Sequence, residues 1–371
     1  MLKQVALVFS IAMLAFSSTG LMARITYDAN VGPSELKNTP HAPEAIVMKD
    51  AADQDVLVVF YKESAASPVG KFVVARQAQA NGALIWDSTS YSIDPAALMI
   101  ENFSPAPVLM GEKLYVLGRL NKGLGDGQRK LIYNAVNNNV QDLIDNHWLS
   151  DTFFTHIQDG LATNPDPDRD EISLVNVGED RLLMSYHAAS NANNIKFSTS
   201  TCRVKNNSPY GELFCEGGEV YSDRKVDYRY PTHVNNVTYN GNTTTALFNR
   251  VNRDIALHGF NPDTLEWNNF HNANLFYLSE HPFSTVQFGD TLYLYAKDLN
   301  SPGLLESYAF TWCMACPTAF NHTYPVRPVG GDMESGYHTT KGPKALVFAG
   351  KLYIFYVDKK TGLLRYLVRE A

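Results

Sequence analysis

Residues 56–62 read Val-Leu-Val-Val-Phe-Tyr-Lys, a short apolar run that ends at a cation. Five later segments repeat this pattern, in which a turn is followed by a strand rich in Leu, Tyr and Phe, at residues 114–119, 182–187, 245–250, 292–297 and 352–357. The strand-end residue is basic or titratable in five of the six segments: Lys62, Arg119, His187, Arg250 and Lys297, with Val357 in the sixth. The chain is therefore built from repeats of one β-unit.

The spacing of the repeats predicts a radial array of β-sheets. Equivalent strand ends are 57, 68, 63, 47 and 60 residues apart, which is too long and too unequal for a helical solenoid. Four-stranded sheets joined by loops of variable length fit this spacing, so we predict an all-β, six-bladed β-propeller. A seventh blade stays open as an alternative, because residues 134–170 form a long stretch without an assigned unit.

Each unit is predicted to hold four strands, of which the recurring run is the second. The first strand ends in a turn at Gly111, Gly178, Gly241, Gly289 or Gly350, or at residues 50–55 in the first unit. The third strands are expected at residues 72–74, 131–133, 195–197, 255–257, 305–308 and 364–366. The outer strands are expected around Trp86, Trp148, residues 213–214, Trp267 and residues 322–326.

The last unit lacks an outer strand, because the chain ends soon after Tyr366. A ring of blades has to close, since an open edge strand exposes unpaired backbone groups. We predict that residues 24–28, Arg-Ile-Thr-Tyr-Asp, supply the missing strand. Ile25 to Tyr27 should then pair beside Leu364 to Leu367.

The first 23 residues have the features of a secretory signal. Lys3 precedes an apolar run from Val5 to Phe16, and the small residues Ser17, Ser18 and Gly20 follow it. This run is too short to span a bilayer comfortably, and no later stretch of about eighteen apolar residues exists. We therefore predict a signal peptide at residues 1–23 and a single propeller domain at residues 24–371, secreted or periplasmic, monomeric and without a membrane span.

The charge of the chain argues against a nucleic-acid partner. The formal net charge is −7, and nothing in the sequence suggests the basic face of a nucleic-acid binder. Any recognition of an anion must therefore be local.

Four cysteines in an exported chain predict two disulfides. Cys202 and Cys215 flank a polar turn between two strand-like runs, so that pairing them would staple a hairpin. Cys313 and Cys316 would then pair within Cys-Met-Ala-Cys.

No cofactor is expected, although two metal sites stay open as alternatives. Cys313, Cys316 and His322 are a possible zinc ligand set. Asp166, Asp168 and Asp170 alternate as ligands do in calcium loops, without the glycine of an EF-hand loop.

One rim of the predicted propeller collects the residues with functional chemistry. The loops before each first strand and after each second strand share a rim in this fold. That rim should hold the strand-end cations together with the following residues: His41, Asp168, Arg169, Asp170, Tyr228, Arg229, Tyr230, Glu280, His281, His338 and Lys341.

Residues 168–267 carry a resemblance to a known family. Asp180-Arg181-Leu182-Leu183-Met184-Ser185-Tyr186-His187 is followed by Tyr228-Arg229-Tyr230-Pro231-Thr232-His233 and then by Leu247-Phe248-Asn249-Arg250. This region resembles the BNR-repeat, sialidase-like β-propellers that include ulvan-lyase-type polysaccharide lyases. In that family a histidine follows the second strand of one blade, a tyrosine opens the next, and an arginine follows its second strand. His187, Tyr230 and Arg250 match these positions in order.

The resemblance implies β-elimination at a uronate of an acidic polysaccharide. Arg250 would neutralise the charge that develops when the C5 proton leaves, Tyr230 or His187 would take that proton, and the other would assist the leaving oxygen. Arg119, Lys297, Lys62, Arg229 and His281 are the expected substrate-binding residues, with an acidic oligo- or polysaccharide as the partner.

Other functions stay open on the sequence. A hydrolase of sialidase-like type would need two carboxylates at the bond, and Asp170, Glu171, Glu280 and Asp298 are available. A lectin usually repeats one pocket in every blade, because multivalency multiplies weak affinities. The segments that open the units differ here, as His41-Ala42-Pro43 and Tyr230-Pro231-Thr232 show, which favours one asymmetric site and an enzyme. A purely structural propeller would leave the strand-end cations unexplained.

Overall fold

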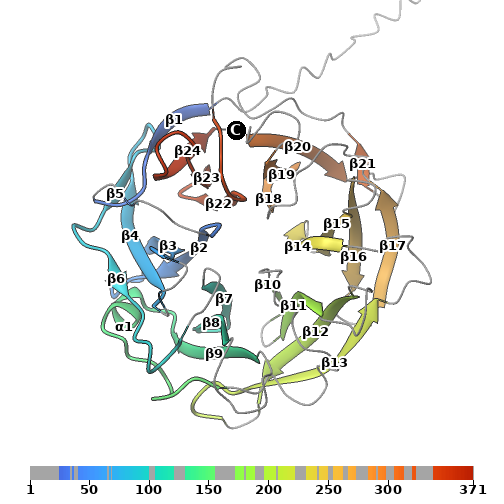
Figure 1. Cartoon of the computed structure of the whole chain (residues 1–371), viewed down its shortest axis with the longest axis horizontal. Coiled ribbons are helices and arrows are strands. Elements are labelled where there is room, and N and C mark those ends of the chain that lie inside the picture. Colours follow the sequence, from blue (N-terminus) through green and yellow to red (C-terminus); the bar gives the residue numbers. More distant parts are fainter. Residues whose placement is uncertain are drawn as a thin grey trace, which may run out of the picture.

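The computed structural model is an all-β ring. It describes residues 25–33, 36, 41–64, 67, 69–99, 105–120, 130–154, 172–178, 181–188, 196–205, 208–221, 231–239, 242–249, 254–261, 266–272, 283–289, 291–297, 305–312, 320–322 and 337–370. Within these residues the strands form six antiparallel sheets. The sheets stand around a central axis, as predicted for a β-propeller (Figure 1).

The first three sheets follow the chain from the inner to the outer strand. The first contains β2 (Glu44–Lys49), β3 (Asp55–Tyr61), β4 (Lys71–Ala78) and β5 (Leu84–Trp86), with β6 (Tyr91–Ser92) also paired to β4. The second contains β7 (Ala106–Met110), β8 (Lys113–Leu120) and β9 (Lys130–Asn137). The third contains β10 (Ile172–Gly178), β11 (Arg181–Ala188), β12 (Lys196–Val204) and β13 (Leu213–Tyr221).

The remaining sheets keep the same order. The fourth contains β14 (Pro231–Tyr239), β15 (Asn242–Asn249), β16 (Asp254–Asn261) and β17 (Glu266–Asn272). The fifth contains β18 (Ser284–Phe288), β19 (Thr291–Lys297), β20 (Leu305–Trp312) and β21 (Phe320–His322). The sixth contains β22 (Lys344–Phe348), β23 (Lys351–Val357) and β24 (Leu364–Arg369).

The N-terminal strand β1 (Ile25–Asn30) completes the sixth sheet, as the sequence predicts. It pairs antiparallel with β24, so that Tyr27 lies opposite Val368 and Asn30 opposite Arg365. Arg365 donates hydrogen bonds from Nε and Nη2 to the two carboxylate oxygens of Asp28, at 3.1 and 2.7 Å. Strands from the two ends of the described chain therefore share one sheet.

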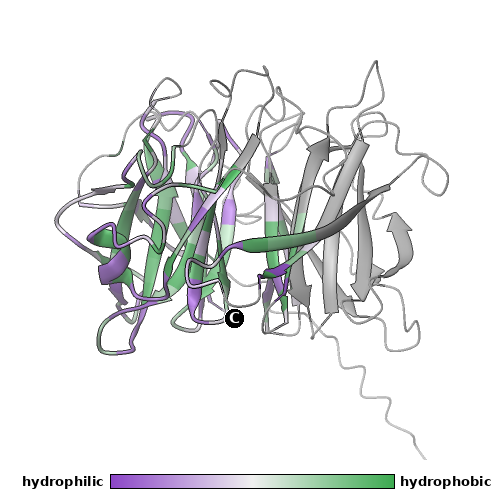
Figure 2. Ribbon diagram, turned by 90° about the horizontal axis from the view of Figure 1, so that it is seen from below, coloured by the Kyte–Doolittle hydropathy of each residue, from purple (hydrophilic) through white to green (hydrophobic). Residues whose placement is uncertain are grey.

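The hydrophobic core lies between neighbouring sheets, which explains why the second strands are apolar along their length. In β3, Val56 to Tyr61 have no exposed surface, because alternate side chains point into the cores on the two sides of the sheet. Leu57 and Tyr61 pack with Tyr353 of the sixth sheet, whereas Val58 and Phe60 pack with Val116 of the second. The strands that are coloured by hydropathy in Figure 2 are correspondingly hydrophobic in their interiors.

The inner hairpin turns also follow the prediction. Gly350 turns between β22 and β23 at a φ of 73°, a left-handed conformation that favours glycine. Asp53 takes the equivalent position between β2 and β3 at a φ of 58°, where the first unit has no glycine. Gly241 lies outside the described residues.

The predicted outer strand at Trp148 is wrong. β9 is followed by helix α1 (Val140–Ile144), whose first turn is capped by the Asn139 side chain, 2.9 Å from the Gln141 backbone nitrogen. Trp148 lies beyond this helix and donates from Nε1 to Asn146 Oδ1 at 3.1 Å. Residues 138–154 form no strand of the second sheet: an isolated bridge joins Phe154 to Tyr133, and Leu149 donates its backbone N–H to the Ala135 carbonyl at 2.8 Å.

One predicted disulfide is confirmed. Cys202 of β12 and Cys215 of β13 form a disulfide and lie directly opposite each other in the sheet. Cys313 and Cys316 lie outside the described residues, so the second pair and the zinc alternative stay predictions.

No helix in the described part of the chain is long and apolar enough to cross a membrane.

Candidate functional site

The strand order brings four lysines and one histidine from three sheets to one rim. His41 precedes the inner strand β2, and Lys341 precedes the inner strand β22. Lys62 follows β3, Lys297 ends β19, and Lys359 comes two residues after β23. Because first strands leave this rim and second strands return to it, all five residues lie at the same end of the ring. We call these five residues the cationic rim cluster.

Polar contacts hold the inner strands of these sheets together at the rim. Lys344, at the start of β22, forms an ion pair with Glu44, at the start of β2, with 2.5 Å between Nζ and Oε2. Ala345 donates its backbone N–H to Ser284 Oγ of β18 at 2.9 Å. Both contacts are among largely buried atoms, so they fix the fifth, sixth and first sheets relative to one another.

Lys341 and Lys359 are carried by two loops that are fastened to each other. Thr339 forms a β-bridge with Asp358. Lys359 donates its backbone N–H to the His338 carbonyl at 2.8 Å, and Thr340 donates to the Val357 carbonyl at 3.0 Å. The fully buried Thr339 donates from Oγ1 to the Lys341 carbonyl at 2.5 Å. The positions of both lysines are therefore set by main-chain contacts.

His41 is uncharged at neutral pH. Its pKa is lowered to about 4, chiefly by burial, with the charges of Lys62 and Lys341 acting in the same direction. Its Nε2 atom is buried and has no hydrogen-bond partner in the part of the chain that the structure describes. The rim thus holds a neutral imidazole beside two cations.

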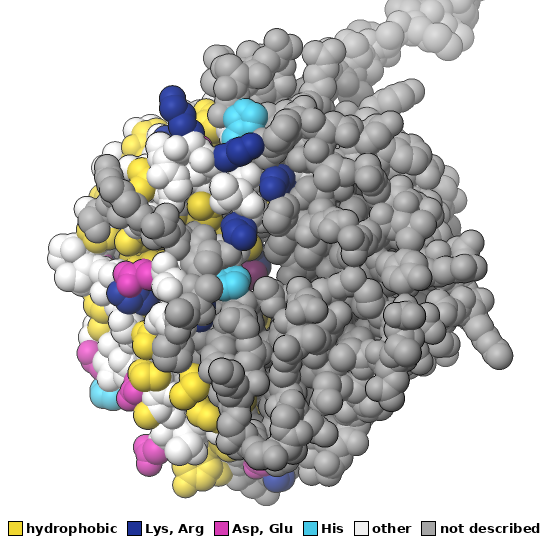
Figure 3. All heavy atoms as spheres, viewed as in Figure 1, with side chains coloured by type: hydrophobic (Ala, Val, Ile, Leu, Met, Phe, Trp, Pro, Cys, Tyr) yellow, Lys and Arg dark blue, Asp and Glu magenta, His cyan; other side chains and the backbone are white. Residues whose placement is uncertain are grey.

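The pKa of Lys297 is lowered by the same kinds of cause as that of His41. Burial lowers the pKa of its ammonium group, and the charges of Lys359 and Lys341 act in the same direction. Neither Lys297 nor Lys341 forms an ion pair with any described residue. Lys and Arg side chains lie close to His side chains beside the centre of the ring (Figure 3).

Two of the predicted binding residues, Lys62 and Lys297, lie at the same rim, on the first and the fifth sheet. Lys62 is fully buried, and its charge acts on the neighbouring His41 from beneath the surface. Arg119 and His187 lie near the ends of β8 and β11, which return to the same rim. The other predicted site residues lie outside the described part of the chain: Tyr230, Arg250, Arg229, His281, Asp166, Asp168 and Asp170.

Lys359 is the cluster residue that the strand-end pattern missed. The sixth run ends at Val357, and the cation comes two residues later, in the turn after β23. A search for cations anywhere in the loop after each second strand would have found it.

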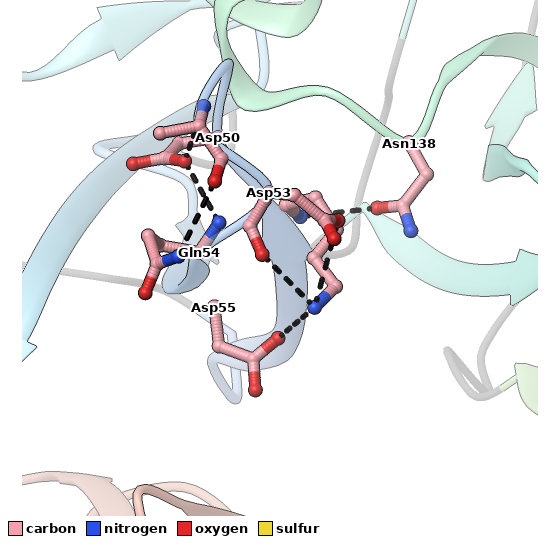
Figure 4. Close-up of polar contacts among 7 residues, drawn as sticks. Asp50, Asp53, Gln54, Asp55 and Asn138 are labelled. Carbon is pink, nitrogen blue, oxygen red and sulfur yellow. Dashed lines mark hydrogen bonds and ion pairs between the residues drawn. The ribbon is translucent and has the colours of Figure 1, made fainter.

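The opposite rim of the first sheet carries three aspartates, which form hydrogen bonds and ion pairs within the β2–β3 turn (Figure 4). Asp50 Oδ1 accepts hydrogen bonds from the backbone N–H groups of Ala52 and Gln54, at 2.8 and 2.9 Å. Lys49 Nζ lies 2.9 Å from Asp55 Oδ1 and donates to the Asp53 carbonyl at 3.2 Å. These contacts shape the β2–β3 turn. No group of three potential metal ligands occurs among the described residues.

No protein-family model matches the sequence, and no curated protein matches it. Solved structures do match. The α-L-arabinofuranosidase Arb93A of Fusarium graminearum, in complex with an iminosugar inhibitor, is 12% identical with a TM-score of 0.54, over 93% of this chain and 98% of the enzyme. The six-bladed lectin of Aleuria aurantia, described with a novel fucose recognition mode, is 8% identical with a TM-score of 0.51, over 88% and 91%.

A sialidase of Trypanosoma rangeli, in complex with the inhibitor DANA, is 12% identical with a TM-score of 0.51. The match covers 92% of this chain and 59% of that protein. At such identities the likeness concerns the fold, and it agrees with the β-propeller arrangement of the sheets.

Proposed function

We propose that this protein binds an acidic saccharide at the cationic rim cluster. The observation that carries the proposal is the convergence of Lys297 and Lys341, without ion pairs to described residues, beside Lys62, Lys359 and an uncharged His41. The fold matches support a saccharide as the ligand, since they include a lectin that recognises fucose and an arabinofuranosidase holding an iminosugar.

The cluster suits a carboxylate or sulfate for electrostatic reasons. Like charges repel, and partial burial strengthens that repulsion because the surroundings screen it less than water does. An anion placed between the ammonium groups turns repulsion into attraction. Glu44 is an anion at the same rim, but it forms its ion pair with Lys344.

Cleavage of the bound saccharide is the second candidate function. The resemblance of residues 168–267 to polysaccharide lyases supports β-elimination with His187, Tyr230 and Arg250. The position of Arg119 and His187 near the ends of β8 and β11 favours it, because these strands return to the rim that carries the cluster. Hydrolysis, as in the sialidase and the arabinofuranosidase with this fold, is the alternative reaction and would require a pair of carboxylates.

The proposal extends to the domain organisation, the oligomeric state and the location of the protein. We propose that six blades make up the complete ring, in one domain at residues 24–371 that follows a signal peptide and acts as a monomer. The Cys202–Cys215 disulfide supports a secreted or periplasmic location, because disulfides persist in oxidising compartments.

Calorimetric titration of the mature protein with acidic and neutral polysaccharides tests the proposal. We expect binding of acidic polymers that weakens as salt is added, because salt screens charge interactions. Lys341→Gln should lower the affinity about tenfold, which corresponds to about 1.4 kcal/mol. The exposed Lys205, in the β12–β13 turn, provides the matched control Lys205→Gln, which should bind as the wild type does.

Product analysis of the same mixtures separates the reactions. Unsaturated products absorbing in the near ultraviolet indicate a lyase, and reducing ends without that absorbance indicate a hydrolase. Binding without either product indicates a lectin. If no acidic saccharide binds, the proposed function is wrong.

A further inference from the structure

We infer that a saccharide bound at the cationic rim cluster holds the ring closed, so that ligand binding and the pairing of β1 with β24 stabilise each other. The inference rests on the proposed function and concerns the regulation of that site. It follows from the position of the cluster, which lies where the first and the last strands of the described chain meet.

The ring is closed by hydrogen bonds and not by a loop. β1 and β24 are the first and the last described strands, and they are neighbours in the sixth sheet. From β1 the chain continues to β2, the inner strand of the first sheet, which lies beside the sixth sheet (Figure 1). The link between strands β22 to β24 and the first sheet therefore runs through the pairing with β1 and through contacts between the two sheets. We call this place the closing junction.

The cluster lies on both sides of the closing junction. Lys344 and Glu44, the first residues of β22 and β2, form the 2.5 Å ion pair across it. Lys341 and His41 each lie three residues before these paired positions, in the segments that enter the sixth and the first sheet. The effect of the Lys341 charge on the pKa of His41 agrees with this arrangement. A ligand held by Lys341 therefore also lies against the first sheet.

The segment after β1 connects the closing strand to the site. Leu364, the first residue of β24, accepts a hydrogen bond from the Val31 N–H at 2.9 Å and donates its own N–H to the Leu36 carbonyl at 3.1 Å. Val31 and Leu36 are buried in the core that joins the first and the sixth sheet. The same segment leads on to His41. Separation of β1 from β24 would break both hydrogen bonds and release the chain that carries His41.

The ring contains a second junction of the same construction, which provides a matched comparison. Tyr366 of β24 accepts a hydrogen bond from the Leu84 N–H of β5 at 2.9 Å, between the sixth and the first sheet. Tyr133 of β9 accepts one from the Leu213 N–H of β13 at 2.7 Å, between the second and the third sheet. No member of the cluster belongs to the second or the third sheet. The two junctions therefore differ in whether the cluster lies beside them.

Thermodynamic linkage makes the effect reciprocal. A ligand that binds the closed ring and not the open one stabilises the closed ring by RT ln(1 + [L]/Kd). The population with an open closing junction falls by the corresponding factor, and amide hydrogen exchange through that opening slows with it. Amides that exchange through openings elsewhere, which leave the cluster intact, gain no such protection.

Amide hydrogen exchange of the mature protein with and without ligand tests the inference. Tetragalacturonate and a short sulfated dextran are the acidic probes, and maltotetraose is the neutral control. The closing reporters are the N–H groups of Val31 and Leu364, and the N–H of Leu213 is the reporter at the matched junction. At a free ligand concentration of about 100 times Kd, we expect exchange at the closing reporters to slow by about 100-fold. Exchange at Leu213 should stay unchanged, and maltotetraose should affect neither junction.

Substitutions on the two sides of the linkage check its direction. Asp28→Ala removes the ion pair with Arg365 and should speed exchange at the closing reporters by about tenfold without ligand. Lys341→Gln should lose about tenfold of the protection at the same ligand concentration, because its affinity is lower. Tyr133→Phe is the matched control, which should speed exchange at Leu213 and leave the closing reporters as in the wild type.

The outcomes distinguish this inference from the proposed function. If an acidic probe binds in calorimetry but the closing reporters slow no more than Leu213, acidic-saccharide binding stands and the coupling to closure is wrong. Equal slowing at both junctions would show that the ligand stabilises the whole molecule, and it would also reject the coupling. If neither acidic probe binds, the proposed function fails, and the inference fails with it. The wild-type comparison decides the matter even if Asp28→Ala does not fold.

Discussion

His41 should make the protein less stable in mild acid. Its pKa is lowered from 6.5 to about 4 by burial and by the charges of Lys62 and Lys341. Between these values the unfolded chain binds a proton at His41 and the folded protein does not. The free energy of unfolding must therefore decrease as the pH falls from 6.5 to about 4, and level off below it.

Urea denaturation across this pH range measures the effect. We expect His41→Gln to have a shallower pH dependence than the wild type in the same window. His147→Gln, at a side chain that is 67% exposed, is the control for replacing a histidine at the surface. Equal slopes for wild type and His41→Gln would contradict the prediction.

The sequence predicts the rim more successfully than the roles of individual residues on it. His41, His338 and Lys341 were expected there because they precede inner strands, and Lys62 and Lys297 because they follow second strands. The burial of Lys62 and the uncharged state of His41 were not foreseeable, since both depend on neighbours from other sheets. Local sequence contains no information about such contacts.

At the scale of the element, the Cys202–Cys215 disulfide should stabilise the outer hairpin of the third sheet. The two cysteines are 13 residues apart and buried, and a loop of that size is worth about 3 kcal/mol in the chain-entropy model. We expect Cys202→Ala combined with Cys215→Ala to lower the free energy of unfolding by about 2–4 kcal/mol. Chemical denaturation without reductant measures it, and a double variant as stable as the wild type would show that the cross-link adds nothing.

The strands of the repeats were predictable because each carries its own signal. An apolar run bounded by a turn residue predicts a second strand wherever it occurs, and β3, β19 and β23 begin and end within a residue or two of the expected positions. The outer positions carry weaker signals. Val140, Leu143 and Ile144 have helical spacing after the capping residue Asn139, and this signal outweighs the expectation of a strand at Trp148.

At the scale of the whole molecule, the N-terminal strand should determine whether the ring is stable. β1 pairs along β24, and Ile25 contributes to the core with Ile354 and Leu367. Without β1 these side chains lose their cover, and the edge of β24 exposes unpaired backbone groups that favour aggregation. A chain beginning at Val31 should therefore melt at a clearly lower temperature than a chain beginning at Arg24.

A point substitution tests the same closure without removing the strand. The Asp28–Arg365 ion pair is largely buried, with side-chain exposures of 27% and 24%, and Arg365 donates two hydrogen bonds in it. Asp28→Ala should cost about 1–3 kcal/mol, the range for hydrogen bonds to charged groups. Glu212→Ala, in the exposed pair with Lys205, should cost less than about 1 kcal/mol. If the chains beginning at Arg24 and Val31 melt together and Asp28→Ala is no worse than Glu212→Ala, the ring does not depend on its N-terminal strand, and the interfaces between the sheets alone must hold it closed.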